Sequence, residues 1–253
     1  MNNISVVIIT RNEAPVLANT LQSLQGLTDD LVIVDSGSTD ETIAIARQFN
    51  AHLVQTEWLG FGPTKNLGNL STRHDWILSL DADEAIDEEL KNNLQHISLT
   101  VDENSVYDLS FKTFTGNYQL RFGEYARDHH IRLFNKQQVQ WDNALVHEKL
   151  VIPSHITIKK LHGYVHHYTM KDFDSYSRKL FNYAILNAQK LFNAGKKVSS
   201  VKMYLSPLTA FIINYIFKMG FLDGWRGYVA ARLSAFYTFL KYAHLKELWQ
   251  RGQ

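Results

Sequence analysis

The stretch WILSLDAD, residues 76–83, joins a largely apolar run to two carboxylates, Asp81 and Asp83. Because side chains alternate along an extended strand, the two carboxylates point to the same side of it. Oxygen ligands of this kind suit Mg²⁺ or Mn²⁺ shared with substrate phosphates, and we expect the strand tip to face solvent. Taken alone, the pattern is also typical of a solvated turn that caps the next helix.

A second carboxylate follows an earlier apolar run, in the stretch LVIVDSGSTD at residues 31–40. Ser38 or Thr39 can cap the helix that follows, and Asp40 favours its positive end. Asp35 precedes these capping positions, so a ligand explains its place better than a cap does. Ligands of open α/β sheets bind beyond the carboxyl ends of the strands.

The N-terminal hundred residues alternate between strand and helix patterns. Strands are expected at residues 4–9, 31–34, 52–55 and 76–80. Helices are expected after Asn12, which would cap the first of them, after Asp40, and at residues 65–70 and 84–97. Repeated right-handed β-α-β crossovers predict a doubly wound, Rossmann-like α/β domain with a parallel sheet.

Four motifs occur in order along this half: VVIITRNE at 6–13, VDSGSTD at 34–40, GFG with KN at 60–66, and LDADE at 80–84. As an ordered set they resemble the family 2 glycosyltransferases. RLF at 132–134, VHE at 146–148, HY at 167–168 and KYAHL at 241–245 resemble the branch that adds glucose or a related sugar to the lipopolysaccharide inner core. The resemblance implies a GT-A nucleotide-sugar-binding domain with a mixed sheet, an inverting transfer from a UDP-sugar, and a Mg²⁺ or Mn²⁺ cofactor.

The resemblance also implies roles for individual residues. Asp35 would accept a hydrogen bond from the nucleotide base, and Lys65, after a Gly-Phe-Gly loop that lets backbone approach a ligand, would meet the diphosphate. Lys65 could instead be a solvated surface lysine, and His167 a structural histidine paired with Tyr168. The remaining assignments are Thr10 and Asn12 to the base pocket, Asp81 to ribose and metal, and Asp83 and His167 to the metal. Pro63-Thr64 departs from many relatives, which carry Gln before the lysine.

Transfer to a sugar hydroxyl requires a base, and Glu148 is the candidate. It follows an expected hairpin of residues 132–135 and 139–141. The alternative is a surface carboxylate that pairs with Lys149. Asp128 and Asp142 are next in line as bases.

Zinc is a competing interpretation of a dense histidine set: His129, His130, His147, His155, His162, His166 and His167. The chain has no cysteine, and His162 and His166 fall in a strand pattern, so the usual zinc-ligand spacings are missing. The absence of cysteine excludes disulfides and is compatible with a reducing cytosol. The six-residue apolar run near the N-terminus does not have the pattern of a secretory signal.

Charge is distributed unevenly over the 253 residues. Residues 1–100 hold 5 Lys and Arg against 14 Asp and Glu, a net −9, and residues 101–253 hold 21 against 11, a net +10. The two halves therefore meet different partners. Nucleic acid is not expected, because no nucleic-acid fold signature occurs and an anionic lipid or phosphorylated glycan uses the same electrostatics.

Residues 171–253 have a helical pattern, with a first stripe from Phe173 to Leu191 that ends at Gly195. Residues 203–217 carry no charge and are flanked by Lys202 and Lys218, yet they are too few to span a bilayer comfortably. Aromatic and basic residues around them favour an interfacial segment at an anionic membrane; a helix–helix core or a dimer interface is the alternative.

We therefore expect a GT-A domain at residues 1–170, with a nucleotide-sugar half (1–100) and an acceptor half (101–170), and a membrane-associating helical extension at 171–253. The expected location is cytoplasmic, peripheral at the inner membrane face, and the expected acceptor is lipopolysaccharide or another glycan. A haloacid dehalogenase-type phosphatase fits less well, because its Asp-x-Asp follows the first core strand and here the pair follows the fourth. A non-catalytic relative that binds sugar nucleotides or lipids is the other alternative.

Overall fold

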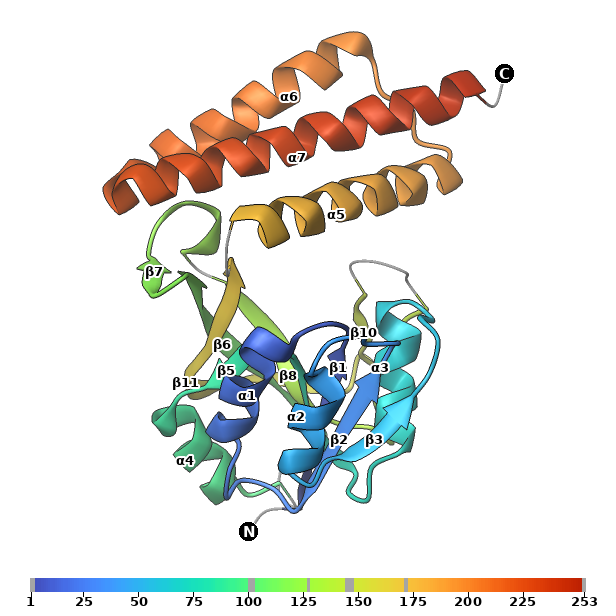
Figure 1. Cartoon of the computed structure of the whole chain (residues 1–253), viewed down its shortest axis with the longest axis vertical. Helices are drawn as coiled ribbons and strands as arrows, with labels where there is room; N and C mark the ends of the chain where they lie inside the picture. The colour runs from blue at the N-terminus through green and yellow to red at the C-terminus, as the bar shows by residue number, and fades with distance from the viewer. Residues whose placement is uncertain (1–2, 100–102, 127, 144–147, 171–172, 252–253) are drawn as a thin grey trace. The chain divides into compact units, whose positions relative to one another are not determined.

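The computed structural model describes residues 3–99, 103–126, 128–143, 148–170 and 173–251 (Figure 1). The chain forms two compact units: residues 1–111 with 129–167, and residues 112–128 with 168–253. The sequence pattern did not predict that residues 112–128 group with the C-terminal helices.

The N-terminal part of the first unit has the expected alternation of strands and helices. Its strands β1 (Ile4–Thr10), β2 (Asp30–Asp35), β3 (His52–Gln55) and β4 (Trp76–Asp81) pair in parallel in the order β3-β2-β1-β4. Helices α1 (Ala14–Ser23), α2 (Thr42–Gln48) and α3 (Phe61–Leu70) connect them. All four predicted strands are confirmed.

Beyond β4 the sheet continues as β8-β6-β11-β5, and the β4–β8, β6–β8 and β11–β5 pairs are antiparallel. The elements here are β5 (Glu84–Ile86), α4 (Glu88–His96), β6 (Ser105–Thr115), β8 (His129–Asn135) and β11 (Thr157–Met170). The whole sheet is thus mixed, as the family resemblance implied. This is the GT-A-like arrangement. The parallel arrangement that the crossover pattern predicted for the N-terminal hundred residues is confirmed for β1 to β4.

Two local predictions in this half are wrong. The helix expected at 84–97 begins only at Glu88, because residues 84–86 pair with β11 and Asp87 caps the helix by accepting a hydrogen bond from the backbone N–H of Leu90 at 2.8 Å. The expected hairpin of 132–135 with 139–141 does not form: β8 pairs with β4 and β6, while β9 (Gln140–Trp141) pairs with β10 (Leu150–Val151).

Buried strands fill both faces of the parallel half. On β1, Ile4, Val6 and Ile8 enter one apolar cluster, and Val7 and Ile9 enter another on the opposite face. Such two-sided burial explains why β1 is a largely apolar run in the sequence.

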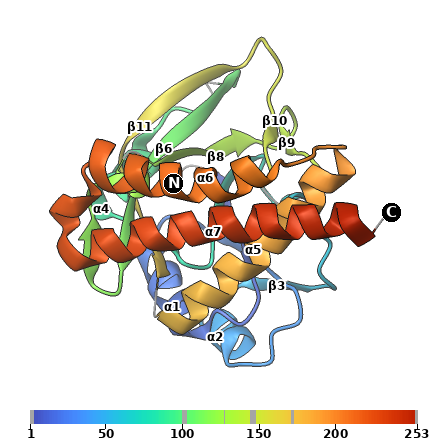
Figure 2. The ribbon, with the colours of Figure 1, turned by 90° about the horizontal axis from the view of Figure 1, so that it is seen from above.

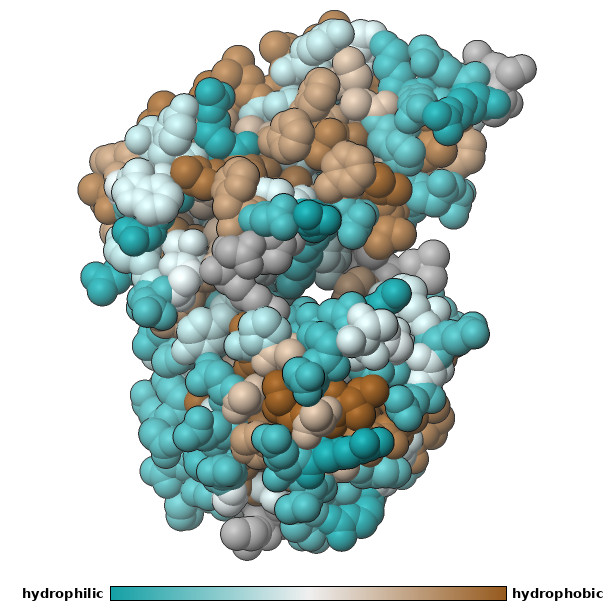
Figure 3. Space-filling model, in the orientation of Figure 1, coloured by the Kyte–Doolittle hydropathy of each residue, from teal (hydrophilic) through white to brown (hydrophobic). Residues whose placement is uncertain are grey.

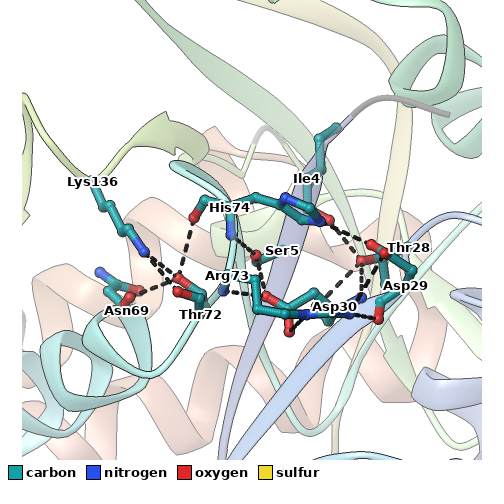
Figure 4. Close-up of polar contacts among 10 residues, drawn as sticks. All are labelled: Ile4, Ser5, Thr28, Asp29, Asp30, Asn69, Thr72, Arg73, His74 and Lys136. Carbon is teal, nitrogen blue, oxygen red and sulfur yellow. Dashed lines mark hydrogen bonds and ion pairs between the residues drawn. The ribbon is translucent and has the colours of Figure 1, made fainter.

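A polar cluster ties the first residues of these strands together (Figure 4). Asp30, which is 5% exposed, accepts hydrogen bonds from the Ser5 hydroxyl and from the Arg73 backbone N–H at 2.7 Å. Burial opposes ionisation of Asp30, but the bonds from Ser5 and Arg73 outweigh it and lower the pKa of the carboxyl. The cluster fixes the first residues of these strands relative to one another. The carboxyl ends of the strands take no part in it.

The second unit contains β7 (Tyr118–Leu120), the 3₁₀ turn η1 (Gly123–Tyr125), α5 (Phe173–Asn193), α6 (Ser200–Ile212), the π-helical η2 (Ile213–Phe217), the 3₁₀ turn η3 (Gly220–Asp223) and α7 (Gly224–Arg251). Helix α7 packs along both α5 and α6 (Figures 1 and 2). Leu180 and Ala184 of the predicted α5 stripe are buried, whereas Phe173 is exposed.

Within the described residues, no single helix is long and apolar enough to cross a membrane. Residues 200–217 and 220–251 reach that length and composition only as a pair, which is bent by 73°.

Candidate functional site

The carboxyl ends of β2 and β3 border a pocket of about 500 Å³ in the first unit. Its lining residues are Arg11, Asp35, Ser36, Gly37, Gln55, Thr56, Glu57 and Trp58. Thr10 pairs with Asp35 in the β1–β2 register, but Thr10 and Asn12 are not among the lining residues. Of the predicted base-pocket residues, Asp35 is thus the one that reaches the pocket.

Asp35 also has a local structural role. Its Oδ2 accepts hydrogen bonds from the backbone N–H groups of Gly37 at 3.1 Å and Ser38 at 3.0 Å, and its Oδ1 from the Ser38 hydroxyl. These bonds hold the turn after β2, a local role that the sequence analysis did not consider. A carboxylate offers about four lone-pair sites, so these three bonds leave capacity for a ligand.

The predicted helix caps are also wrong. Asn12 has a left-handed backbone (φ 56°), and its side-chain oxygen accepts from the backbone N–H of Thr39 at 2.8 Å instead of capping α1. Ser38 and Thr39 do not cap α2; Asp40 accepts from the backbone N–H of Thr42 at 3.1 Å and of Ala14 at 3.2 Å. The Asp40 carboxylate thus accepts hydrogen bonds from the first turns of both α1 and α2.

Lys65 lies between two of the predicted site carboxylates. Its Nζ is 2.7 Å from Glu148 Oε1 and 3.1 Å from Asp81 Oδ1, and its side chain is 1% exposed. Burial excludes the interpretation of Lys65 as a solvated surface lysine. Glu148 correspondingly pairs with Lys65, and not with Lys149 as the surface alternative required.

Close packing of α3 brings Lys65 to Glu148. A Cβ at Gly62 would come within 1.9 Å of the Asp142 carbonyl oxygen, so the glycine allows α3 to approach Asp142 closely. Asn66 exchanges two hydrogen bonds with the Trp141 backbone, of 2.9 and 3.0 Å. The Lys65-Asn66 motif therefore places the lysine and fixes the strand before Glu148.

Arg132 and Glu84 complete the charged network, and the sequence analysis gave neither a role. Arg132 Nη2 lies 3.2 Å from Asp81 Oδ2 and also contacts Glu84 Oε1, while Glu84 Oε2 accepts from the Asp81 backbone N–H at 2.9 Å. Arg132 also lies over the Phe111 ring, 5.5 Å from its centroid. The sequence signals that could have pointed to these two residues were the RLF motif, which contains Arg132, and the LDADE motif, which contains Glu84.

Burial and these cations set the protonation of the network. Burial would raise the pKa of Asp81, but the charges of Lys65 and Arg132 outweigh it and hold the pKa well below its ordinary value. Burial raises the pKa of Glu84 despite the opposing charge of Arg132. Asp81 is thus a firmly ionised carboxylate at neutral pH.

Asp83 and His167 face each other, with Asp83 Oδ2 3.5 Å from His167 Nε2. The antiparallel pairing of β11 with β5 sets His167 opposite Glu84, next to Asp83. Asp83 is only 5% exposed, so the expectation of a solvent-facing strand tip is wrong. Asp83 lies between β4 and β5, and β5 pairs with β11.

The donor set fits a divalent cation. Asp81, Asp83, Glu84 and Glu148 carry four negative charges when ionised, against two positive charges on Lys65 and Arg132. A carboxylate beside a neutral imidazole is a suitable ligand pair for Mg²⁺ or Mn²⁺. No group of three or more metal-ligating side chains is preformed among the described residues.

The other predicted positions contribute less. Asp142, an alternative base, accepts a hydrogen bond from the backbone N–H of Lys149 at 3.2 Å and so supports the β9–β10 turn. His129 pairs with Asp108 at 2.8 Å, away from the network of Lys65. Val146 and His147 lie outside the described residues.

Known proteins resemble this chain in sequence over most of its length. Residues 5–150 match the family model "Glycosyl transferase family 2", which is more than half of the chain. The protein therefore belongs to glycosyl transferase family 2.

Relatives extend over nearly the full chain. An uncharacterized glycosyltransferase of Rickettsia felis is 30% identical over 98% of this chain and 90% of its own length. The lipopolysaccharide core biosynthesis glycosyltransferase LpsC of Rhizobium meliloti is 25% identical over 96% of this chain and 91% of its own. Among solved structures, S. aureus TarS 1-349 in complex with UDP-GlcNAc aligns over 100% of this chain and 93% of its own, with 14% identity and a TM-score of 0.46.

Proposed function

We propose that this glycosyltransferase is an inverting enzyme that moves a sugar, glucose in the first instance, from a UDP-sugar to a glycan acceptor such as the lipopolysaccharide inner core. The observation that carries the proposal is the buried Lys65, held between Asp81 and Glu148. This arrangement puts Lys65, proposed to meet the diphosphate, in contact with Asp81, proposed to lie by the ribose, and with Glu148, the proposed catalytic base. The similarity to LpsC supports the acceptor class.

The donor would enter at the pocket lined by Asp35. There the carboxylate can accept a hydrogen bond from an N–H of the nucleotide base, and an ionised acceptor makes that bond strong. In the β1 register, Thr10 pairs with Asp35 and Ile9 pairs with Asp81, so the two carboxylates end on either side of one strand. That spacing suits a base at one side and ribose and diphosphate at the other.

Glu148 would take the proton of the acceptor hydroxyl as it attacks the anomeric carbon, while the nucleoside diphosphate departs. Lys65, which holds Glu148 in place, would also meet the negative charge of the diphosphate as a point charge. A single lysine would thereby link the base to the leaving group.

Asp83, His167 and Asp81 would hold the Mg²⁺ or Mn²⁺. When bound, the cation would neutralise charge that develops on the departing nucleoside diphosphate. Arg132 would keep Asp81 oriented through its contact at 3.2 Å.

We place the enzyme, as part of the same proposal, in the cytoplasm at the anionic inner face of the membrane. The exposed apolar residues of the second unit and the excess of basic residues after residue 100 support this location.

A panel of nucleotide sugars tests the donor. UDP-glucose should raise the thermal unfolding temperature more than GDP- or dTDP-sugars, because a ligand that binds only the native state stabilises it by mass action. Turnover of the labelled stabilising donor, with deacylated lipopolysaccharide core as acceptor, then distinguishes an enzyme from a non-catalytic binding relative. Stabilisation without turnover would favour the binding relative, and no stabilisation by any UDP-sugar would overturn the proposed donor.

A further inference from the structure

Large exposed apolar side chains concentrate in one part of the second unit. Of the 22 such residues among the described residues, 13 lie between Val201 and Phe236. Their densest group, which we call the apolar corner, joins α6 to α7 and comprises Ile216, Phe217, Met219, Phe221, Leu222 and Trp225. Phe217 is 76% exposed and Trp225 66%. Hydrophobic residues cover much of this unit in the space-filling view (Figure 3).

Buried polar bonds hold the backbone beneath the corner. Asp223 is 4% exposed and accepts hydrogen bonds from the backbone N–H groups of Arg121 at 3.0 Å and Phe122 at 2.9 Å. Asn214, also buried, donates to the Ser234 hydroxyl at 3.1 Å. A fixed backbone therefore presents the apolar side chains outward, and the backbone of Arg121 and Phe122 supports it.

Glycines keep this support tight. A Cβ at Gly227 would lie 1.9 Å from the Gly220 carbonyl oxygen, so η3 and the first turns of α7 touch backbone to backbone. With no room for the corner side chains underneath, they remain in solvent unless something covers them. An exposed apolar group of this size is a binding surface and not scattered exposure.

The charges around the corner select the partner. Residues 200–236 contain four basic residues, Lys202, Lys218, Arg226 and Arg232, and one acidic residue, Asp223. Asp223 is buried and satisfied by backbone donors, so the surface charge that residues 200–236 contribute is positive. Aromatic side chains with basic neighbours suit the headgroup region of an anionic bilayer.

We infer that the apolar corner is the membrane-inserting element of this protein, with Phe217 and Trp225 entering the headgroup region of an anionic bilayer and Lys218 and Arg232 lying at its phosphates. This inference deepens the proposed membrane location and rests on it, but it does not depend on the identity of donor or acceptor. Phe211, by contrast, stacks on Tyr215 with ring centroids 5.2 Å apart and belongs to the support.

The cysteine-free chain allows a direct test. A single Phe217→Cys substitution carries an environment-sensitive fluorophore, and Asn182→Cys, on the exposed face of α5, is the matched control. With phosphatidylglycerol-containing vesicles, the probe at 217 should shift to the blue and become shielded from an aqueous quencher. The probe at 182 should do neither. A probe at 217 that remains accessible on vesicle-bound protein overturns the inference.

Substitutions give the energetic test. Phe217→Ser and Trp225→Ser should each weaken sedimentation with anionic vesicles about tenfold, since a buried aromatic side chain is worth more than that factor. Leu70→Ser and Ile158→Ser, exposed in the first unit, should not change it. The inference is overturned if the corner variants Phe217→Ser and Trp225→Ser do not weaken sedimentation. It is also overturned if the control variants Leu70→Ser and Ile158→Ser weaken it equally.

Two further readouts separate the possible failures. Shielding of the 217 probe that increases with protein concentration without vesicles would assign the corner to a second copy and overturn the membrane partner. Transfer to a detergent-free, deacylated acceptor should persist in Trp225→Ser, because the corner lies outside the charged network. Absence of transfer in the wild type would contradict the proposed function and leave vesicle insertion independently measurable.

Discussion

At the scale of single residues, Lys65 organises the site. A lysine that is 1% exposed between carboxylates at 2.7 and 3.1 Å neutralises one negative charge of a strongly acidic cluster. Arg132 neutralises a second, at Asp81 and Glu84. Removal of one partner of such a pair leaves an uncompensated buried charge. Substitution of Lys65 or Arg132 should therefore destabilise the folded protein.

Glu148→Gln should lower turnover on the order of 10² to 10⁴ fold, because the amide keeps the size and can still accept a hydrogen bond from Lys65 but cannot take a proton. Donor affinity, measured by calorimetry with UDP-sugar, should barely change. Asp142→Asn on the same hairpin is the control and should keep turnover. Near-normal turnover of Glu148→Gln would move the base elsewhere, and lost donor binding would make Glu148 structural.

Arg132→Met should destabilise the protein by roughly 3 to 5 kcal/mol in denaturant unfolding, because Glu84 and Asp81 lose the guanidinium they share. The double variant Arg132→Met with Glu84→Gln should recover part of that loss, since it removes one of the two stranded charges. Additive losses in the double variant would show that the two residues do not act as a pair.

At the scale of elements, the parallel strands are fixed at their beginnings by Asp30, Ser5 and Arg73, and present functional groups at their ends. The pKa of Asp30 is lower in the folded chain than its ordinary value of 3.8. A lowered folded pKa contributes stability above the ordinary value, and that stability is lost as the pH falls through the range below it.

Asp30→Asn should therefore lower the free energy of unfolding at neutral pH by about 1 to 3 kcal/mol, the usual cost of unsatisfied buried hydrogen bonds. The difference from the wild type should shrink in acid. Urea unfolding at pH 7 and near pH 3 measures it. Asp75→Asn, at an exposed position outside the cluster, is the control. A constant difference at all pH values would contradict the linkage.

At the scale of the whole molecule, charge is uneven: residues 1–100 are acidic and residues 101–253 are basic. Under the proposed function the acidic part would meet a nucleotide with its cation, and the basic part an anionic surface. The predicted metal ligands come from distant parts of the chain, Asp83 after β4 and His167 on β11. The mixed half of the sheet is what makes them neighbours.

Asp83→Asn should abolish the additional thermal stabilisation that Mn²⁺ gives in the presence of UDP, and with it transfer. Because Asp83 is buried, asparagine is a safer replacement than alanine, which would leave a void. His96→Asn, an exposed histidine on α4, controls for nonspecific metal binding. Full activity of the wild type after chelation would refute metal dependence.

The sequence by itself determined the parallel half of the sheet, because strands buried on both faces must be apolar runs and their ends must carry the polar groups. It also pointed to Asp35, Asp81 and Asp83 as residues at strand ends. Periodicity could not separate the three-residue β5 from the helix after it, because so short a strand has no pattern of its own.

The tertiary structure alone decided which groups touch. Lys65 and Glu148 are 83 positions apart, and Arg132 and Glu84 are 48 apart, so no local pattern links them. The proximity of His167 to Asp83 likewise depends on the pairing of β11 with β5. Local periodicity reports which face of an element is apolar, whereas charge pairing and burial depend on elements that meet only when the sheet closes.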